Sequence, residues 1–121
     1  MFLYTKLSVY QKAFALNKRL YQLLKNSSSI PPYIKQQLGR ASLSIMLNIA
    51  EGSAKTSSKD KRNFMVIACA STFETNALIH FLASENEIKI EDSSYLSNQL
   101  EEISKMLFAM IKQLEGRDRA S

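Results

Sequence analysis

Apolar residues recur at helical spacing in four separate stretches of the 121-residue chain. The clearest series lies nearest the C-terminus and has the heptad-like spacing of a bundle helix. Its members are Leu96, Leu100, Ile103, Leu107, Met110 and Leu114. The four stretches predict helices at about residues 8–25, 32–51, 58–87 and 94–115, joined by short polar connections. We therefore expect an all-α fold, an antiparallel up-down-up-down four-helix bundle, in a single domain spanning residues 1–121.

The first predicted helix has an apolar side and a basic side. Apolar and aromatic residues recur along it at helical spacing. They are Leu7, Tyr10, Phe14, Leu20, Tyr21, Leu23 and Leu24. The opposite side carries Ser8, Lys12, Lys18, Arg19, Gln22 and Lys25. Ser8 and Gln11 have the spacing of a capping box, which predicts that the helix begins there. This pattern places the aromatic side toward the core and the lysines in solvent.

The second predicted helix is apolar on nearly every side between Ala41 and Ala50. Pro31 and Pro32 fit its first turn, and Gly52 is placed to end it as a C′ residue. A helix in a four-helix monomer leaves one face in solvent, so a helix that is apolar all round indicates burial on several sides. We therefore expect this helix to pack against a neighbouring subunit in a homo-oligomer.

The beginnings of the last two helices carry capping signals. Ser57 and Asp60 form a capping-box-like pair before the third helix. An acidic connection from Asn86 to Ser94 precedes the fourth helix, and its last residues, Asp92 to Ser94, are good N-cap types. These signals predict helices that begin near residues 58 and 94.

Polar residues interrupt the apolar surfaces of the second and third helices. On the second helix, Arg40, Ser44, Asn48 and Glu51 fall within about 80° of one another. A buried charge must be paired, so we hypothesise that Arg40 meets Glu74 or Glu51 in a partly buried network. Asn48 then satisfies the remaining donors and acceptors. Such a network more often fixes helix register and subunit pairing than performs chemistry.

Charge is distributed unevenly along the chain, whose formal net charge is +5. Residues 1–62 contain 11 Lys and Arg but two acids, a charge of +9. Residues 63–121 contain 5 Lys and Arg and 9 acids, a charge of −4. This asymmetry predicts a dipolar molecule with a surface suited to polyanions.

Two groups of basic residues are candidates for binding nucleic acid. The first lies on the first helix and comprises Lys12, Lys18, Arg19 and Lys25. The second lies where the third helix begins and comprises Lys55, Lys59, Lys61 and Arg62. This second group adds cations to helix N-terminal amides, a combination suited to phosphates. A solvated basic surface is the simpler interpretation of the same residues. No DNA-reading motif is recognised, so we expect binding through backbone charge and shape, with RNA favoured over DNA.

The sequence indicates no catalytic centre, metal site or cofactor. The only histidine, His80, belongs to no Glu-x-x-His pair, and no Cys/His cluster suits zinc. Cys69 lies eleven residues from His80, about three helical turns, which is too far for a catalytic dyad. We therefore expect a protein that is not an enzyme. A single cysteine suits a reducing compartment, and the apolar runs Ile45–Ala50 and Phe64–Ala70 are far shorter than a membrane span. A bacterial cytoplasmic protein is the expectation.

Three blocks of the sequence resemble a known family. Residues 7–13, LSVYQKA, are similar to its opening L-x-V-W/Y-Q-K-A, and residues 38–52, LGRASLSIMLNIAEG, to its signature L-x-R-A-x-x-S-I-x-x-N-I-A-E-G. The residues similar to its third block are Ser58-Lys59-Asp60, Phe64, Ile67-Ala68, Ser71 and Glu74. On these residues the chain resembles the bacterial four-helix bundle proteins linked to 23S rRNA intervening sequences, the S23 family. Met46 and Ala70 depart from the pattern, which often has proline and glycine there.

The resemblance implies an assembly and partners. The family includes the accessory variability determinant of diversity-generating retroelements, a basic homopentameric barrel that associates with a reverse transcriptase and its template RNA. It implies a pentameric bundle without catalytic activity here, and the number five comes from the resemblance alone. Two functions stay open. One is an accessory protein that binds structured RNA or RNA/DNA and a reverse transcriptase. The other is an intervening-sequence-type scaffold of undefined role without direct nucleic acid binding. A small-molecule-binding bundle or enzyme is a third and weaker alternative.

Overall fold

The computed structural model describes residues 2–120, with side chains described up to Arg117. These residues form a short 3-10 helix, η1 (Leu3–Lys6), and four α-helices. The α-helices are α1 (Ser8–Asn26), α2 (Pro32–Ser53), α3 (Ser58–Ser84) and α4 (Ile90–Ala120). The expected all-α four-helix bundle is confirmed.

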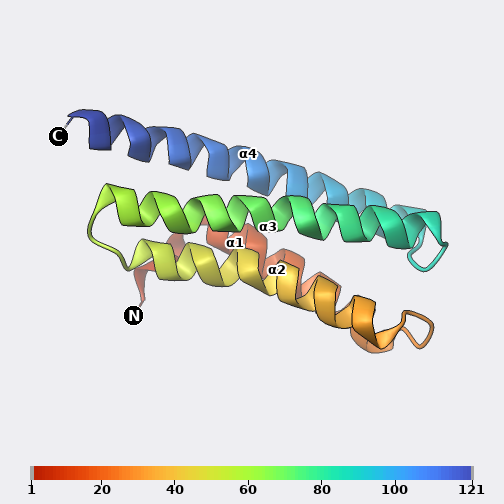
Figure 1. The fold of residues 1–121 in the computed structure, drawn as a ribbon. Coiled ribbons are helices and arrows are strands. Elements are labelled where there is room, and N and C mark those ends of the chain that lie inside the picture. Colours follow the sequence, from red (N-terminus) through yellow and green to blue (C-terminus); the bar gives the residue numbers. More distant parts are fainter. Residues whose placement is uncertain (1, 121) are drawn as a thin grey trace.

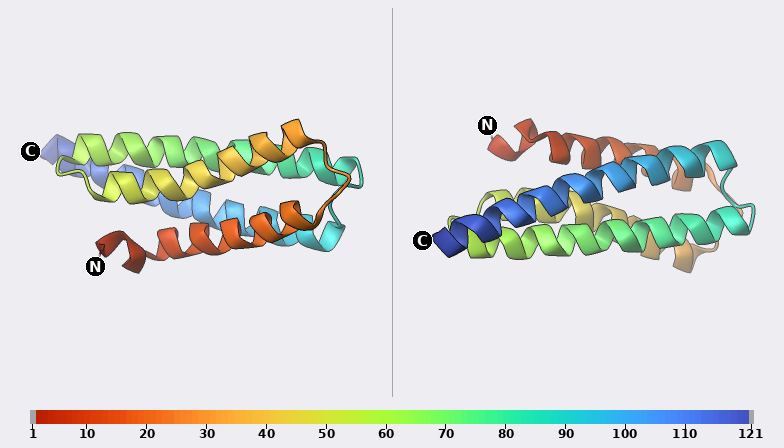
Figure 2. Two further views of the ribbon diagram at one scale, coloured as in Figure 1. Left: turned by 90° about the horizontal axis from the view of Figure 1, so that it is seen from below. Right: turned by 90° about the horizontal axis from the view of Figure 1, so that it is seen from above.

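The four helices run alternately up and down (Figure 1). Each helix packs against the next one in the chain, and α1 also packs against α4. Consequently α1 and α3 occupy opposite corners of the bundle, with α2 and α4 between them (Figure 2). One end of the bundle gathers the beginnings of α1 and α3 and the ends of α2 and α4.

Helix α1 is rotated relative to the sequence prediction. Its buried apolar residues form a small, aliphatic row at helical spacing. They are Val9, Ala13, Leu16 and Leu20. Phe14 and Tyr21 face outward instead, 46% and 63% exposed, whereas Tyr10 is half-buried and packs against the core. Two apolar rows compete for the core on this helix. The aliphatic row occupies it because the short Ala13 side chain lets the helix approach its neighbours closely.

Asn17 holds α1 in this rotation. Its side chain is buried, and Nδ2 donates to the carbonyl oxygens of Ala13 and of Ser42 on α2, each at 2.9 Å. A buried amide without partners would cost free energy, so these two bonds favour one angle of α1 about its axis. Asn17 is not among the residues predicted from the sequence to shape the fold.

The apolar seam predicted for α4 is confirmed. Leu96, Leu100, Ile103, Leu107 and Leu114 are buried, and Met110 packs against the core. The buried residues of α3 are Met65, Ala68, Cys69, Ser71, Thr72, Thr75, Ile79 and Leu82. Ile67 of the same helix is 48% exposed.

The turn between α3 and α4 is tighter than predicted. Asn86 has a φ of 60°, a left-handed conformation that Asn tolerates better than most residues. The amide of Glu87 donates to the carbonyl of Leu82, and that of Asn86 to Ala83, which is a Schellman ending. Helix α3 therefore ends at Ser84 and not near residue 87.

Helix α4 begins four residues before the predicted position, at Ile90. Asp92 does not cap it, because its carboxylate pairs with Arg19 of α1. The amide of Ser93 already donates to the carbonyl of Lys89, so it lies within the first turn. At the other end the helix continues through Gly116 to Ala120, beyond the predicted end near residue 115.

Two further predictions, for the beginning of α1 and the end of α2, are wrong. The capping box expected from Ser8 and Gln11 does not form, because Leu7 is the N-cap and Gln11 Nε2 donates to the carbonyl of Thr5. Gly52 is not a C′ residue but lies inside α2, where it is buried. A Cβ on Gly52 would lie 2.8 Å from Phe64 Cβ and 2.9 Å from Met65 Cε. Glycine here allows the close crossing of α2 and α3.

We predict that Gly52→Ala destabilises the bundle, because the Phe64 Cβ is fixed to the α3 backbone and cannot move aside alone. Overpacking of this kind costs about 1–3 kcal/mol. Gly39→Ala is the matched control, since a Cβ there meets nothing within 4 Å. It should stabilise α2 by up to about 1 kcal/mol. Urea unfolding followed by circular dichroism measures both, and equal effects of the two substitutions would contradict this account.

Candidate nucleic-acid interface

Basic residues gather at the end of the bundle where α1 and α3 begin. Three segments meet there, residues 3–8, 51–62 and 112–117. Their cations are Lys6, Lys55, Lys59, Lys61, Arg62, Lys112 and Arg117, and their acids are Glu51, Asp60 and Glu115. Seven cations against three acids leave a formal charge of +4. We call this surface the basic end.

The opposite end of the bundle has the reverse balance. Residues 24–35 and 84–93 meet there and contribute Lys25, Lys35 and Lys89 against Glu85, Glu87, Glu91 and Asp92. The charge asymmetry therefore runs between the two ends of the bundle. The two halves of the chain differ in charge, but the antiparallel fold lays the acidic α4 beside the basic α1, so the halves do not form separate charged faces.

The beginning of α3 positions the cations of the basic end. Ser57 is the N-cap, and its Oγ accepts a hydrogen bond from the amide of Asp60 at 3.0 Å, as the capping signal predicted. Lys59 is exposed in the first turn of the helix. Lys61 Nζ donates to the carbonyl of Ser53 at 3.2 Å, where the C-terminal carbonyls of α2 favour a cation. Lys55 Nζ lies 5.1 Å from the centroid of the Phe64 ring.

Three of the eight predicted nucleic-acid-binding residues pair with acids of α4. Lys12 meets Glu102 at 3.1 Å, Arg19 meets Asp92 at 3.1 Å, and Arg62 meets Glu115 at 3.0 Å. These pairs are partly exposed, so each contributes little stability, but each reduces the charge available to a phosphate. The remaining five are Lys18, Lys25, Lys55, Lys59 and Lys61. They divide between the outer face of α1 and the basic end and do not form one continuous patch.

A groove of about 250 Å³ opens at the basic end. Its apolar lining comes from Leu3, Tyr4, Leu7, Met65, Met110 and Leu114. Lys61 and Arg117 contribute cations to the same groove. An apolar depression with two positive groups suits a ligand that has a flat or apolar portion and an anionic portion.

The predicted polar network forms in two separate parts. Arg40 Nη2 donates to Gln37 Oε1 at 2.7 Å, and Gln37 Nε2 donates to Glu74 Oε2 at 2.8 Å. Among the described residues no ion pair joins Arg40 to Glu74 or to Glu51, so the expected direct pairing is wrong. Gln37, which the sequence analysis missed, bridges the two charges. Arg40, Glu74 and Glu51 are also exposed on this chain and not partly buried.

The second part of the network lies deeper between α2 and α3. Ser44 Oγ and Ser71 Oγ are 2.8 Å apart, and Asn48 Nδ2 donates to the carbonyl and to Oγ of Ser44 at 2.8 and 3.0 Å. The hydroxyl pair connects the two helices at a position where Ser71 is buried. These bonds fix the register of α2 against α3.

The outward faces of α2 and α3 are apolar. On α3 the exposed residues include Val66, Ile67, Phe73 and Phe81, with Phe73 59% and Phe81 51% exposed. On α2 they include Leu43 and Leu47. We call the α3 residues Ile67, Phe73 and Phe81 the α3 apolar row. By length and composition alone α3 is apolar enough to cross a membrane, a property that it shares with the core helices of soluble proteins. The sequence analysis assigned the excess apolar surface to α2, and the structure adds a longer row on α3.

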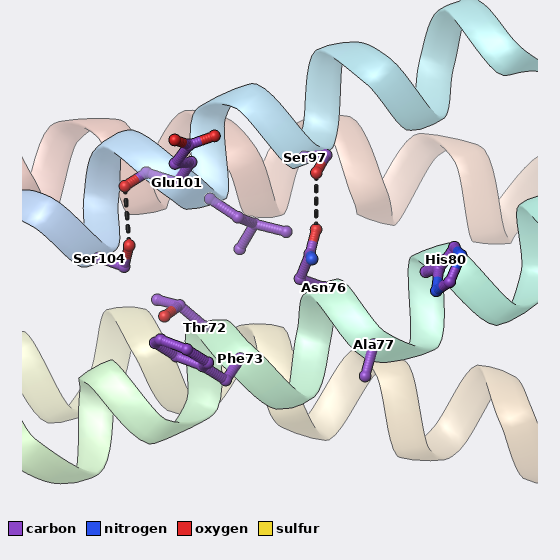
Figure 3. Close-up of a pocket in the computed structure, with 9 residues that line it drawn as sticks. Thr72, Phe73, Asn76, Ala77, His80, Ser97, Glu101 and Ser104 are labelled. Carbon is purple, nitrogen blue, oxygen red and sulfur yellow. Dashed lines mark hydrogen bonds between the residues drawn. The ribbon is translucent and has the colours of Figure 1, made fainter.

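A second groove, of about 440 Å³, lies between α3 and α4 (Figure 3). Ser97 Oγ donates to Asn76 Oδ1 at 2.8 Å across it, and His80 lies exposed at one end. The hydroxyl and amide satisfy each other, so the groove presents a hydrogen-bonded helix seam and not a set of converging reactive groups. Cys69 is buried in the core, and burial raises the pKa of its thiol, which keeps it protonated near neutral pH.

The sequence and fold together place the chain in a known group of proteins. A family model described as 23S rRNA-intervening sequence protein matches residues 5–109. The chain belongs to this family. The chain is also similar to a solved crystal structure, that of a protein of unknown function from the S23 ribosomal protein family of Bacteroides thetaiotaomicron VPI-5482. The two sequences are 28% identical. The similarity covers 86% of this chain and 98% of that one, with a TM-score of 0.81. No protein of curated function matches the chain.

We predict different costs for breaking the two parts of the polar network. Gln37→Leu separates Arg40 from Glu74, which are both exposed, and should cost less than about 1 kcal/mol. Ser71→Ala leaves the Ser44 hydroxyl without its partner on α3 and should cost about 1 kcal/mol or more. Urea unfolding gives the free energy of unfolding of each variant. A greater destabilisation by Gln37→Leu than by Ser71→Ala would contradict this prediction.

Proposed function

We propose that this family member is a non-enzymatic, basic, oligomeric accessory protein that binds structured RNA or RNA/DNA. The observation that carries the proposal is the basic end, where seven cations from three separated segments converge beside the N-terminus of α3. Helix N-terminal amides and lysines favour phosphate groups together, without selecting a base sequence. A protein partner of the proposed complex is a reverse transcriptase, as in the retroelement accessory proteins that the sequence resembles.

Self-assembly is the second part of the proposal, with a pentamer as the expected form. The α3 apolar row and Leu43 and Leu47 of α2 support it, because monomers rarely expose so many large apolar residues on adjacent helices. An assembly multiplies the number of basic ends presented to one nucleic acid molecule and so raises the overall affinity by avidity. The cell compartment we propose is the cytoplasm.

One observation favours a second candidate function. Three of the predicted binding cations pair with Glu102, Asp92 and Glu115, which lowers the positive charge along α1 and near Arg62. This pattern suits an oligomeric scaffold that binds proteins without touching nucleic acid directly. A measurement of RNA binding would separate the two functions, because only the first requires it.

We predict salt-sensitive binding of an RNA hairpin by the wild-type protein, measured by fluorescence anisotropy. The Lys55→Glu/Lys59→Glu variant should bind more weakly. The slope of log K against log salt should become shallower by roughly 0.7–0.9 for each phosphate that the variant no longer neutralises. The Lys89→Glu/Lys105→Glu variant makes the same formal charge change away from the basic end and should bind like wild type. Wild type that shows no salt-sensitive binding would contradict the proposal and favour the scaffold.

We predict that the wild-type protein has a mass that is a multiple of the 13.7 kDa chain in light scattering at micromolar concentration. Ile67→Glu/Phe81→Glu should shift it toward monomer with unchanged helix content, because both side chains are already exposed on the isolated chain. Gln22→Glu/Asn98→Glu adds the same charge at exposed polar positions and should leave the assembly intact. A monodisperse wild-type monomer would rule out the assembly.

A further inference from the structure

Aromatic rings are in contact along the N-terminal part of the chain. The ring centroids of Phe2 and Tyr4 are 5.8 Å apart, those of Tyr4 and Tyr10 are 4.8 Å apart, and those of Tyr10 and Phe14 are 6.1 Å apart. Phe2 and Phe14 are exposed, whereas Tyr4 and Tyr10 are half-buried and Tyr10 packs against the core. The exposed rings at the ends of this series are available to a ligand.

Lysines alternate with the aromatic residues farther along α1. Lys18 Nζ lies 6.0 Å from the Phe14 ring centroid, and Lys25 Nζ lies 5.9 Å from the Tyr21 ring centroid. The series Tyr10, Phe14, Lys18, Tyr21 and Lys25 has spacings of four, four, three and four residues, which place it on one face of the helix. The predicted position of Lys18 and Lys25 on the side opposite the aromatic residues is therefore wrong. We call this series the α1 stripe. At 1.5 Å per residue it is about 22 Å long.

The charge around the α1 stripe is entirely positive along its own helix. The first acidic residue of the sequence is Glu51, so η1, α1 and most of α2 carry none. Lys12 and Arg19, which pair with α4, lie toward that helix. Within the part of the chain that the structure describes, neither Lys18 nor Lys25 forms an ion pair. These two ammonium groups are free to meet an anion.

A groove of about 500 Å³ runs beside the α1 stripe, between α1 and α2. Tyr21, Leu24 and Lys25 line it from α1, and Lys35 and Leu43 line it from α2. The groove thus has apolar walls with a lysine on each side. Burial, and to a lesser extent the neighbouring Tyr4, raises the pKa of Tyr10, so its phenol stays neutral and does not repel a phosphate.

We propose that the α1 stripe binds single-stranded nucleic acid, with bases stacked on the Phe14 and Tyr21 rings and phosphates held by Lys18 and Lys25. Every unpaired base offers a flat face to an aromatic ring, and alternating cations follow the backbone. Binding therefore does not depend on the base sequence. A duplex hides its base faces within the stack and cannot use the rings. The inference rests on the proposed nucleic acid function and assigns it a second site with its own ligand class.

The α1 stripe is distinct from the other two surfaces. Helix α1 lies at the corner of the bundle opposite α3, so the α1 stripe and the α3 apolar row are on different faces of the chain. The basic end lies at one extremity of the bundle, whereas the α1 stripe extends along its side toward the other. A structured RNA with an unpaired tail would contact both.

Binding of a fluorescent 12-nucleotide oligouridylate and of a blunt RNA duplex of the same length tests this inference. Wild type should prefer the single strand. Phe14→Leu/Tyr21→Leu should weaken single-strand binding by at least about fivefold without changing the slope of log K against log salt. Lys18→Gln/Lys25→Gln should make that slope shallower by roughly 0.7 for each lysine. Tyr33→Leu, which removes an exposed aromatic ring from α2, is the control and should bind like wild type.

The outcomes separate this inference from the proposed function. Single-strand binding that is unchanged in Phe14→Leu/Tyr21→Leu, or equal affinity for the duplex, overturns the α1 stripe. Hairpin binding that depends on Lys55 and Lys59 would then still support the basic end. Single-strand binding that disappears with the rings, but no effect of Lys55→Glu/Lys59→Glu on the hairpin, supports the stripe and overturns the basic end. No binding of any of these nucleic acids at low salt overturns both. Circular dichroism verifies that each variant is folded.

Discussion

The rotation of α1 about its own axis determines most of the surface of this bundle. The helix presents a narrow aliphatic row to the core, and the buried amide of Asn17 joins it to the Ser42 carbonyl of α2. This single orientation turns Lys12 and Arg19 toward the acids of α4 and turns Phe14, Lys18 and Tyr21 outward. A rotation of α1 by a third of a turn would bury the rings and leave the α4 acids without partners.

Three surfaces follow from the arrangement of the four helices, and each suits a different kind of contact. The basic end carries concentrated positive charge, the α3 apolar row carries exposed aliphatic and aromatic side chains, and the α1 stripe combines rings with lysines. They lie at one end, at one corner and at the opposite corner of the bundle. The three surfaces therefore occupy different parts of one chain.

The sequence predicted the helices well where the apolar period was unambiguous and the end signals were local. Leu96 to Leu114 on α4 needed only a heptad-like seam, and Ser57 capped α3 as its type suggested. The prediction was wrong where the local sequence allowed two helix orientations equally well. Helix α1 has two apolar rows, and only the packing of Ala13 and Asn17 against other helices selects between them.

The sequence predicted which residues belong to the candidate site better than it predicted how they are arranged in space. Of the eight basic residues predicted to bind nucleic acid, four are exposed and four are half-buried. The α4 partners of three of them are distant in the sequence, and no local pattern reveals them. Asp92 resembled an N-cap because a short acidic residue before a helix normally is one. Its ion pair with Arg19 depends on the tertiary fold. The same limit explains why Gln37 was overlooked between Arg40 and Glu74.

The convergence of three segments at the basic end has a consequence for biosynthesis. Residues 3–8 are synthesised before residues 51–62, and both are synthesised before residues 112–117, which complete that surface. Arg62 therefore has no Glu115 to meet until α4 has been made. The surface acquires the charge pattern described above only after α4 is synthesised, so capture of a polyanion before that point would involve a different set of cations.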